Sequence, residues 1–514
     1  MLVKVSSALN LGLSTVGMDV EVNVASRGLP ALEIVGLPTK AVAESKQRVK
    51  TAIVNSNIQF PKKRVVINLA PADIPKEGSF YDLPIAAGII AASSDCRLPE
   101  KSLFFGELSL DGKLRHTKGA LLLALFAKEK GIKNIFIPQP SVNEAAVVKG
   151  INIYPVKNLT QLVASFYGQA NLAPIKNLRY KNKGVFQKAE FDISEILGQE
   201  QSKRALEIAA AGAHNLFMVG SPGSGKTMLA RAFSGILPIL GEKESLEVTK
   251  IYSASGLIPP EGSMIKNRPF RSPHHTVSSI GLIGGGSRIR PGEVSLAHRG
   301  VLFLDEFSEF SRSALEALRQ PLEDNRITIC RSRSKATFPS QFILVASANP
   351  CPCGYLYHPK KSCICTEREI EKYRKKISGP LLDRIDIAIK VPIVDVKDLS
   401  EEKKVKKALE NSATIRERVF KARKIQKERL REENIYTNAE MGNNQIKKHC
   451  FLSSQVKRIL IQAAVKFSLS ARAYFKTIKI ARTIADLDFS EDIDVVHMAE
   501  ALQYRYQESE INTI

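Results

Sequence analysis

The sequence predicts an α/β protein of several domains that ends in a helical region. At 514 residues, the chain is long enough for about three domains of roughly 150 residues each. Between about residues 191 and 392, short apolar runs alternate with helical stretches, as in a parallel sheet with crossover helices. One of these apolar runs leads through a glycine-rich loop into a helix. We expect domains at 1–170, 191–395 and 396–514, with a linker at 171–190.

The composition excludes disordered, collagen-like and membrane-embedded proteins. Hydrophobic residues make up 44% of the chain and charged residues 25%, as in proteins that bury cores. The longest apolar stretch, Pro84 to Ala92, is too short to span a bilayer, and we find no export signal. Seven cysteines in a chain of this length indicate reduced thiols, not a disulfide framework. We expect a cytoplasmic protein with no membrane partner.

The chain is strongly basic. Its 75 Lys and Arg residues outnumber its 52 Asp and Glu residues, which gives a formal net charge of +23. Such an excess favours a polyanionic partner, with nucleic acid ahead of a membrane surface. The alternative is a generally basic surface, which charge alone does not exclude.

Residues 1–170 predict a mixed α+β region. Val20–Val24 and Val65–Leu69 are rich in β-branched residues, which is typical of strands. Leu121–Lys130 has the apolar stripe of an amphipathic helix and is followed by Gly131, and Asn134–Ile137 predicts a further strand. The Lys- and Asn-rich stretch that follows, 171–190, has no clear period and indicates a linker.

The strongest motif is a complete phosphate-binding loop, Gly220-Ser221-Pro222-Gly223-Ser224-Gly225-Lys226-Thr227. The apolar run Leu216–Val219 precedes it and a helix follows from Met228, which is the context that the motif requires. Its glycines let backbone N–H groups curl around phosphates. We expect Lys226 to reach the β- and γ-phosphates of ATP and Thr227 to hold Mg²⁺.

Polar residues follow two further apolar runs. Val301–Leu304 leads into Asp305, which we expect to orient Mg²⁺, and Glu306, which we expect to polarise the attacking water. Phe342–Ala346 leads to Asn349, which can hydrogen-bond the water or the γ-phosphate. A strand cap is the alternative for the two acids. This order of elements resembles that of AAA+ ATPases.

The chain beyond Val394 is predicted to be almost wholly helical. Asp398–Glu433 is dense in Lys, Arg and Glu at helical spacing, which is typical of a solvated helix face. Gln455–Leu487 and Asp492–Tyr506 carry apolar stripes and predict further helices.

The whole chain resembles the ComM/YifB family of Mg-chelatase-like AAA+ ATPases. The resemblance rests on five segments: Arg268–His275, Gly284–Gly286, Pro291–His298, Asn349–Gly354 and Ser378–Asp386. It implies an AAA+ P-loop core with a helical lid, and a homo-hexamer with ATP and Mg²⁺ at the subunit interfaces. It also places Arg384 at the arginine-finger position and Arg472 at the sensor-2 position. The alternative for either arginine is a surface side chain whose stem covers apolar residues.

Two insertions in the core follow from the same resemblance. Leu257–Glu293 is similar to the helix-2 insert and, being rich in glycine, is expected to be mobile. Asn325–Ser340 predicts a β-hairpin of the kind that lines the pore of related motors and grips DNA. Its Arg331, Arg333 and Lys335 alternate, so one strand would carry all three on one face. The alternative is a charged edge that prevents aggregation.

The N-terminal region resembles the Lon-protease/S5-like domain through Asn68–Gly78 and Gly106–Leu114. Counting from these segments, the nucleophilic Ser position falls on Phe80 and the catalytic Lys position on Leu121. A Ser–Lys protease needs a hydroxyl activated by an amine, and both groups are missing there, although Ser79 and Lys118 lie nearby. We expect this domain to bind DNA or a partner without hydrolysing peptides.

Four cysteines form two close pairs, Cys351 with Cys353 and Cys363 with Cys365. Four thiolates could converge on a structural Zn²⁺, although the spacing is tighter than in a common zinc knuckle. Free thiols or a redox pair are the alternative. His274 and His275 are adjacent and lack further ligands at metal-binding spacing. We interpret them as part of the fixed geometry of the insert or as a DNA contact.

Together, these observations predict an ATP-dependent hexameric DNA motor or helicase. The family resemblance implies that it promotes branch migration or unwinding in homologous recombination and natural transformation, on single-stranded or branched DNA. A chelatase-like motor that remodels a protein partner is one alternative. A degenerate Lon-like protease is another, and other protein partners stay open.

Overall fold

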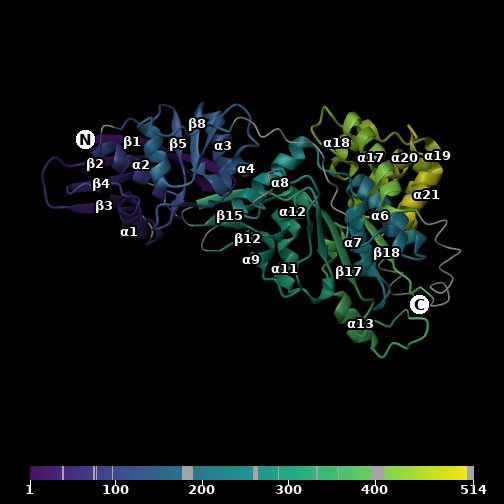
Figure 1. Cartoon of the computed structure of the whole chain (residues 1–514). Coiled ribbons are helices and arrows are strands. Elements are labelled where there is room, and N and C mark those ends of the chain that lie inside the picture. The colour runs from purple at the N-terminus through teal and green to yellow at the C-terminus, as the bar shows by residue number, and fades with distance from the viewer. Residues whose placement is uncertain are drawn as a thin grey trace.

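The computed structural model describes the whole chain except residues 37–39, 73, 75, 77, 95, 176–188, 259–263, 287–288, 332–333, 357, 395–409 and 506–514. Figure 1 shows an elongated molecule. The N-terminal sheet lies at one end, a parallel α/β core in the middle, and the C-terminal helices at the other end. None of the described helices has the length and apolar character needed to cross a bilayer.

The first sheet has the order β1-β2-β4-β3, and only β3 and β4 run parallel. The predicted strands at Val20–Val24 and Val65–Leu69 lie within β2 and β4, as expected. Helix α2 packs against β1 and β2 and is buried from Asp82 to Ala92, since its sequence is almost wholly apolar. The bounds are β1 (Leu2–Leu11), β2 (Ser14–Val24), β3 (Ala31–Val35), α1 (Lys40–Asn55), β4 (Arg64–Ala70) and α2 (Asp82–Ser93).

A second, parallel sheet has the order β5-β8-β9 and is joined by a small hairpin of β6 and β7. The predicted helix at Leu121–Lys130 is α3, which ends next to Gly131 in the left-handed conformation (φ +69°). The bounds are β5 (Ser102–Phe104), β6 (Glu107–Leu108), β7 (Leu114–Arg115), α3 (Ala120–Glu129), β8 (Asn134–Pro138), η1 (Gln139–Ser141), α4 (Val142–Ala145), β9 (Asn152–Val156) and α5 (Leu159–Phe166).

The core is a five-stranded parallel sheet of order β11-β14-β17-β10-β18, which confirms the predicted α/β architecture. Successive residues of a strand face opposite sides, so Phe303 and Leu304 of β14 join two different hydrophobic clusters. The sheet is therefore buried on both faces. The strands are β10 (Leu216–Val219), β11 (Phe270–Arg271), β14 (Val301–Leu304), β17 (Ile343–Ala348) and β18 (Ile387–Lys390).

Helices and two short hairpins surround this sheet. The predicted hairpin at 325–340 is present as β15 and β16. The surrounding elements are η2 (Ile193–Glu195), α6 (Glu200–Gly212), α7 (Lys226–Ile236), α8 (Glu242–Ser255), α9 (Ser279–Ile283), β12 (Gly284–Gly285), β13 (Arg290–Pro291), α10 (Glu293–Leu296), η3 (Phe307–Glu309), α11 (Arg312–Ala317), α12 (Arg319–Asp324), β15 (Arg326–Arg331), β16 (Ser334–Pro339), α13 (Glu367–Arg374) and α14 (Gly379–Leu382).

The C-terminal helices form a lid that packs on α6 and α7 through α17 and α20. Arg418 of α17 anchors the lid by pairing its Nε with Glu207 of α6 at 2.6 Å. Within the lid, the fully buried Asp486 forms ion pairs with Arg429 and Arg482. The elements are α17 (Ser412–Arg429), η4 (Asn438–Glu440), α18 (Asn443–His449), α19 (Ser454–Lys466), α20 (Ala471–Leu487) and α21 (Val495–Gln503).

Among the described residues, the N-terminal region contacts the core through α3 and α4 and through the turn between β1 and β2. Helix α3 packs against α8, and buried Ser253 of α8 donates a hydrogen bond to the carboxylate of Glu144. The turn between β1 and β2 meets the hairpin, because a Cβ added at Gly12 would lie 2.9 Å from Ala336 Cβ. In both contacts, the core contributes a segment that connects two strands of its five-stranded parallel sheet, α8 in the first and the β15–β16 hairpin in the second.

Candidate nucleotide site

The phosphate-binding loop connects β10 to α7 and needs glycine at two turns. Gly223 and Gly225 have φ values of +78° and +85°, which lie in the left-handed region that disfavours a side chain. A Cβ at Gly220 would lie 2.5 Å from the carbonyl oxygen of Val391. The loop therefore opens directly onto the N-terminus of α7, whose free N–H groups and dipole suit phosphate oxygens.

Lys226 lies over this loop. Its Nζ donates to the carbonyl oxygens of Gly220 and Ser221 at 2.6 and 3.0 Å and to Asn349 Oδ1 at 3.2 Å. Burial lowers the pKa of the Lys226 ammonium. The loop, the first turn of α7 and the end of β17 thus meet at one point. The structure brings together Lys226 and Asn349, which are 123 residues apart.

The predicted Mg²⁺ ligands Thr227 and Asp305 are also adjacent. Thr227 Oγ1 donates to Asp305 Oδ2 at 2.7 Å, and Ser347 donates to Asp305 Oδ1. A hydroxyl and a carboxylate are the oxygen ligands that Mg²⁺ prefers beside phosphate groups. The residues present therefore fit Mg²⁺. The role of Ser347 was not predicted; its only signal is a fully buried hydroxyl in the otherwise apolar strand β17.

Glu306 follows Asp305 with a left-handed backbone (φ +52°), which is unusual for a residue other than glycine. Its side chain is exposed, and Oε2 pairs with Nδ1 of His275 at 3.3 Å. The rings of His274 and His275 lie 4.1 Å apart. The sequence predicts that these histidines belong to the fixed geometry of the insert or contact DNA, and it gives no sign that His275 contacts Glu306.

Arg384 and Arg472 lie at the other edge of the sheet. Arg384 precedes β18, whereas the phosphate-binding loop follows β10, and these two strands run parallel in register. Both arginines pair with Glu323 Oε1, Arg384 at 2.5 Å and Arg472 at 2.7 Å. The structure therefore brings the two arginines to each other and places them one strand length away from Lys226 of the same chain.

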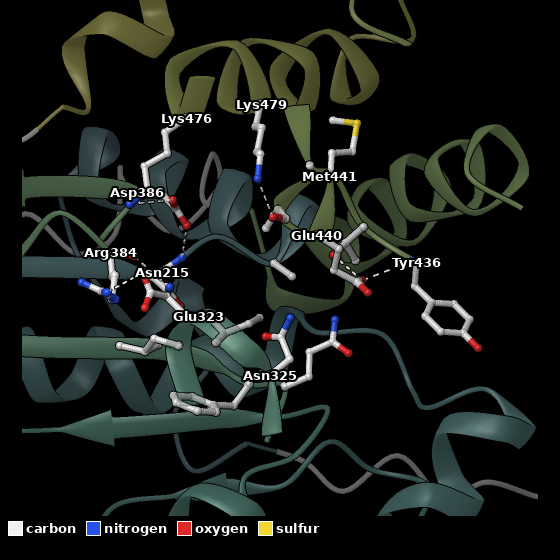
Figure 2. Close-up of a pocket in the computed structure, with 18 of the residues that line it drawn as sticks. Asn215, Glu323, Asn325, Arg384, Asp386, Tyr436, Glu440, Met441, Lys476 and Lys479 are labelled. Atoms are coloured by element: carbon white, nitrogen blue, oxygen red, sulfur yellow. Dashed lines mark hydrogen bonds and ion pairs between the residues drawn. The ribbon is translucent and has the colours of Figure 1, made fainter. Parts of the chain in front are cut away.

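These arginines border a cavity of about 530 Å³ between the core and the lid. Figure 2 shows Arg384 and Glu323 on one side of it, while Lys476 and Lys479 reach toward it from the lid helix α20. Lys476 Nζ pairs with Asp386 at 3.3 Å. Desolvation alone would raise the pKa of the Asp386 carboxyl, but Lys476 and His214 hold this pKa below its usual range. The cavity therefore lies at the amino-terminal ends of the strands, whereas the phosphate-binding loop lies at their carboxyl ends.

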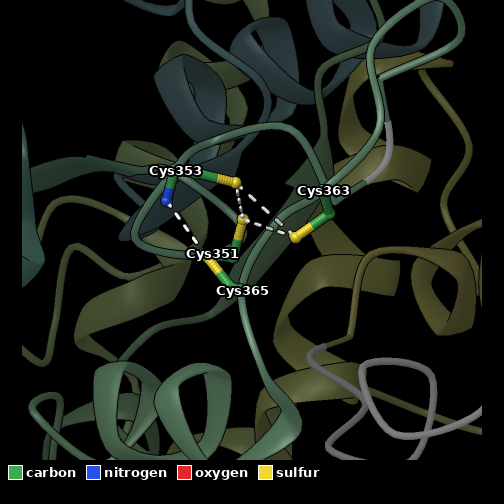
Figure 3. A group of neighbouring side chains, drawn as sticks. All are labelled: Cys351, Cys353, Cys363 and Cys365. Atoms are coloured by element: carbon green, nitrogen blue, oxygen red, sulfur yellow. Dashed lines mark hydrogen bonds between the residues drawn. The ribbon is translucent and has the colours of Figure 1, made fainter.

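The four clustered cysteines converge as predicted (Figure 3). All four Sγ atoms lie within 4.8 Å of one another, and Cys351 Sγ lies 3.4 Å from Cys353 Sγ and 3.6 Å from Cys363 Sγ. Tetrahedral Zn²⁺ with Zn–S bonds of about 2.3 Å would separate its sulfurs by about 3.8 Å. Backbone N–H groups lower the pKa of the Cys353 thiol to about 6, which favours a thiolate. The donor set fits zinc.

The segment that carries the four cysteines, residues 351–365 (the cysteine loop), also contacts the candidate nucleotide site. Gly354 lies between the two cysteine pairs with φ +82°, and a Cβ there would lie 2.6 Å from Pro222 of the phosphate-binding loop. Asn349, which contacts Lys226, precedes Cys351 by two residues. The cysteine loop therefore supports the phosphate-binding loop from outside.

The proposed DNA-binding residues require a correction. The hairpin forms, but its register pairs Arg331 with Ser334 and Cys330 with Lys335. Arg331 belongs to β15 and Lys335 to β16, so the prediction that one strand carries all three basic residues on one face is wrong. Lys335 is exposed on β16, whereas Arg333 lies outside the described residues.

The positions aligned with a Ser–Lys dyad are structural. Phe80 stacks on Phe105 with ring centroids 4.8 Å apart, and Leu121 is fully buried. The neighbouring Ser79 donates to Glu107, while the stem of Lys118 lies against Gly256 of the core. Within the described chain, Ser79 and Lys118 thus contact different residues.

Three protein-family matches cover most of the chain. Residues 192–399 match "Magnesium chelatase, subunit ChlI", residues 20–141 match "Subunit ChlI of Mg-chelatase", and residues 409–505 match "Magnesium chelatase, subunit ChlI C-terminal". The competence protein ComM of Haemophilus influenzae is 41% identical over 98% of this chain and 97% of its own length. The chain belongs to the ComM/YifB family. The Escherichia coli protein YifB is 41% identical over 96% of this chain and 95% of its own length.

More distant similarity reaches the chelatases themselves. The magnesium-chelatase 38 kDa subunit of Cereibacter sphaeroides is 26% identical over 32% of this chain and 54% of its own length. The central sheet of this ComM/YifB member therefore has the AAA+ fold, as predicted from the motifs around Lys226 and Asp305. The family implies ATP and Mg²⁺ as cofactors.

Proposed function

We propose that this chain is an ATP-driven DNA motor that works as a hexameric ring and promotes branch migration or unwinding during homologous recombination and natural transformation. The observation that carries the proposal is the division of the ATPase residues between two edges of one sheet. Lys226, Asp305 and Glu306 lie at one edge, and Arg384 lies at the other. Because the two sets are a strand length apart, a complete site needs two protomers.

The chain's residues have distinct roles in hydrolysis. Lys226 and the N-terminus of α7 bind the β- and γ-phosphates, and Asn349 hydrogen-bonds the γ-phosphate or the water beside it. Mg²⁺ held by Thr227 and Asp305 would neutralise charge on both phosphates. Glu306 accepts the proton of the water as its oxygen attacks the γ-phosphorus and the bond to ADP breaks.

The neighbouring protomer supplies the missing positive charge. The guanidinium of Arg384 spreads charge over the γ-phosphate oxygens as the bond breaks, an effect worth roughly 10³-fold or more in rate. Arg472 of the lid acts at the same phosphate, because both arginines share Glu323 in the separated protomer. Hydrolysis at the interface can then move the lid of one protomer relative to the core of the next.

DNA is the proposed substrate for three reasons. The net charge of +23 favours a polyanion, a hairpin with exposed Lys335 extends from the core, and a relative of matching length is named a competence protein. Six hairpins around a pore would carry Arg331, Arg333 and Lys335 toward the phosphate backbone. DNA access fits the expected cytoplasmic location.

We also propose that Cys351, Cys353, Cys363 and Cys365 bind one structural Zn²⁺. Four protein ligands fill a tetrahedral site and leave no position for a substrate. Elemental analysis of the purified chain should find one zinc per protomer, and Cys363→Ser should lose it while Cys96→Ser, at a buried cysteine outside the cluster, keeps it. Zinc retained by Cys363→Ser would contradict the assignment.

The function is tested by ATPase and strand-displacement assays on single-stranded, forked, three-stranded and four-way DNA, with Lys226→Ala and Glu306→Gln as inactive controls. We expect DNA to raise the hydrolysis rate at low salt and displacement to need hydrolysis. A rate that no DNA form raises would contradict the motor. A chelatase-like motor that remodels a protein partner would then be favoured, as the match to chelatase subunits suggests.

A further inference from the structure

Glu323 joins the two arginines that are proposed to serve the neighbouring protomer. It lies near the end of the short helix α12, and its side chain is 43% exposed. The same carboxylate oxygen, Oε1, accepts from Nη2 of Arg384 at 2.5 Å and from Nη2 of Arg472 at 2.7 Å. A core arginine and a lid arginine therefore share one anionic oxygen.

This arrangement resembles the binding of a phosphate oxygen. Arginines recognise phosphate through charge-assisted N–H bonds to its oxygens, and several guanidinium groups commonly converge on one phosphate group. Arg384 and Arg472 hold the pKa of the Glu323 carboxyl below its usual range, so the group is an anion near neutral pH. Buried Nε of Arg384 has no hydrogen-bond partner among the described residues and could donate to a larger anion.

The surroundings favour an anion that arrives from outside the chain. Seven basic and four acidic residues line the adjoining cavity, so its lining is net positive. Two of these basic residues already have acidic partners, because Arg268 pairs with Glu244 and Lys476 pairs with Asp386. Glu323 stands at the side of this cavity where Figure 2 shows Arg384.

From this geometry, and resting on the proposed function, we propose that Glu323 is an internal competitor for the terminal phosphate of ATP bound to the adjacent protomer. In the separated protomer its carboxylate holds Arg384 and Arg472. When the ring closes on ATP, the γ-phosphate replaces that carboxylate. Glu323 is thus a positioning residue, which acts through the two arginines. Ring closure then depends on a phosphate group that binds Arg384 and Arg472 more strongly than the Glu323 carboxylate does.

The size of the effect follows from exposure. Arg472 and Glu323 are 47% and 43% exposed, and an ion pair this exposed changes an equilibrium constant by at most about fivefold. Arg384 is only 11% exposed, so its pair with Glu323 is less screened and adds to this effect. Removing the charge of Glu323 should therefore lower the protein concentration at which half of the chains assemble with ATP by at least about twofold. The shift should shrink at high salt, since these charges are screened.

The test measures assembly by analytical ultracentrifugation with ATP and no DNA, in a Glu306→Gln background that is expected not to hydrolyse it. Glu323→Gln is compared with Asp324→Asn, a neighbour on α12 with the same charge change, for which we expect no shift. Each substitution is repeated in a chain that also carries both Arg384→Ala and Arg472→Ala. In that chain, Glu323→Gln should not change the protein concentration at which half of the chains assemble. Glu323→Ala gives a second measurement should the Gln variant be unstable.

Assembly at an unchanged or higher concentration would overturn the proposal, as would an equal shift without the two arginines. DNA-stimulated hydrolysis by the wild-type chain is measured separately. If DNA gives no stimulation but the shift is found, the DNA motor fails and the role of Glu323 stands. If the wild-type chain never assembles, the ring itself is contradicted, and both proposals with it.

Discussion

Lys226 Nζ and Asn349 Oδ1 lie 3.2 Å apart, which joins the phosphate-binding loop to the end of β17. This contact links the residue that we propose binds phosphate to the residue that we propose holds the γ-phosphate or the attacking water. Beyond Asn349, the chain enters the cysteine loop, which returns to touch Pro222. The nucleotide site is therefore supported by two different segments of the core.

Replacing Lys226 should strongly weaken nucleotide binding. Lys226→Ala removes a buried ammonium whose bonds to phosphate would be charge-assisted, each worth about 1.5–3 kcal/mol. We expect the dissociation constant of a fluorescent ATP analogue to rise at least tenfold. Lys250→Ala, in helix α8 outside the site, serves as the control and should bind as the wild type does. Unchanged affinity in Lys226→Ala would contradict this role.

Glu306→Gln should separate binding from hydrolysis. The amide keeps the size of the side chain but cannot take a proton from water, so we expect at least a hundredfold loss of turnover with ATP affinity retained. Asp305→Asn should instead weaken the Mg²⁺-dependent part of binding, because Asp305 pairs with Thr227. Rapid-quench assays with labelled ATP measure both effects. Turnover that persists in Glu306→Gln would assign the base elsewhere.

The contact between the cysteine loop and the phosphate-binding loop predicts a glycine effect. Gly354→Ala places a Cβ against Pro222 at a left-handed position, which costs about 1–2 kcal/mol in backbone strain alone. We expect ATP affinity to fall about tenfold while the zinc content stays unchanged. Gly131→Ala is a matched control, because Gly131 has a similar φ and nothing within 4 Å of its Cβ position. Equal effects of both variants on ATP binding would exclude the idea that the cysteine loop supports the phosphate-binding loop through the contact of Gly354 with Pro222.

The hairpin predicts a salt-dependent DNA contact. Replacing Arg331, Arg333 and Lys335 with Gln should weaken DNA binding at low salt. It should also flatten the slope of log affinity against log salt by about 0.7–0.9 for each phosphate that the hairpin no longer neutralises. ATP binding should stay unchanged, because the hairpin is separate from the phosphate-binding loop. Fluorescence anisotropy with labelled single-stranded DNA measures the slope. A slope equal to that of the wild type would place the DNA contact elsewhere.

Much of the core could be predicted because each signal is local. Lys226, Asp305 and Asn349 each follow a strand of one parallel sheet, and the carboxyl ends of such strands share an edge. Glu323 and His275 could not be predicted, since their partners lie in distant segments and no spacing reports the contacts. Their acidic and imidazole groups look like ordinary surface residues in the sequence.

The hairpin shows how a local rule fails. Alternation places residues on one face only while the strand continues, and here Arg331 and Ser334 pair with each other from two antiparallel strands. The sequence between residues 325 and 340 contains no Asn-Gly or Asp-Gly pair of the kind that usually marks a hairpin, so the register of the two strands could not be read from it. The prediction of a hairpin was confirmed, and the prediction of a shared face was wrong.

Mixing two inactive variants tests most directly whether neighbouring protomers share one ATPase site. Lys226→Ala keeps its arginines and Arg384→Ala keeps its phosphate-binding loop, so a ring that contains both can form complete interfaces. With equal amounts and random assembly, about a quarter of the interfaces pair an intact loop with an intact arginine. We predict that each variant alone is inactive and that the mixture regains ATPase activity. A mixture that stays as inactive as its components, although mixed rings are shown to form, would contradict the shared site.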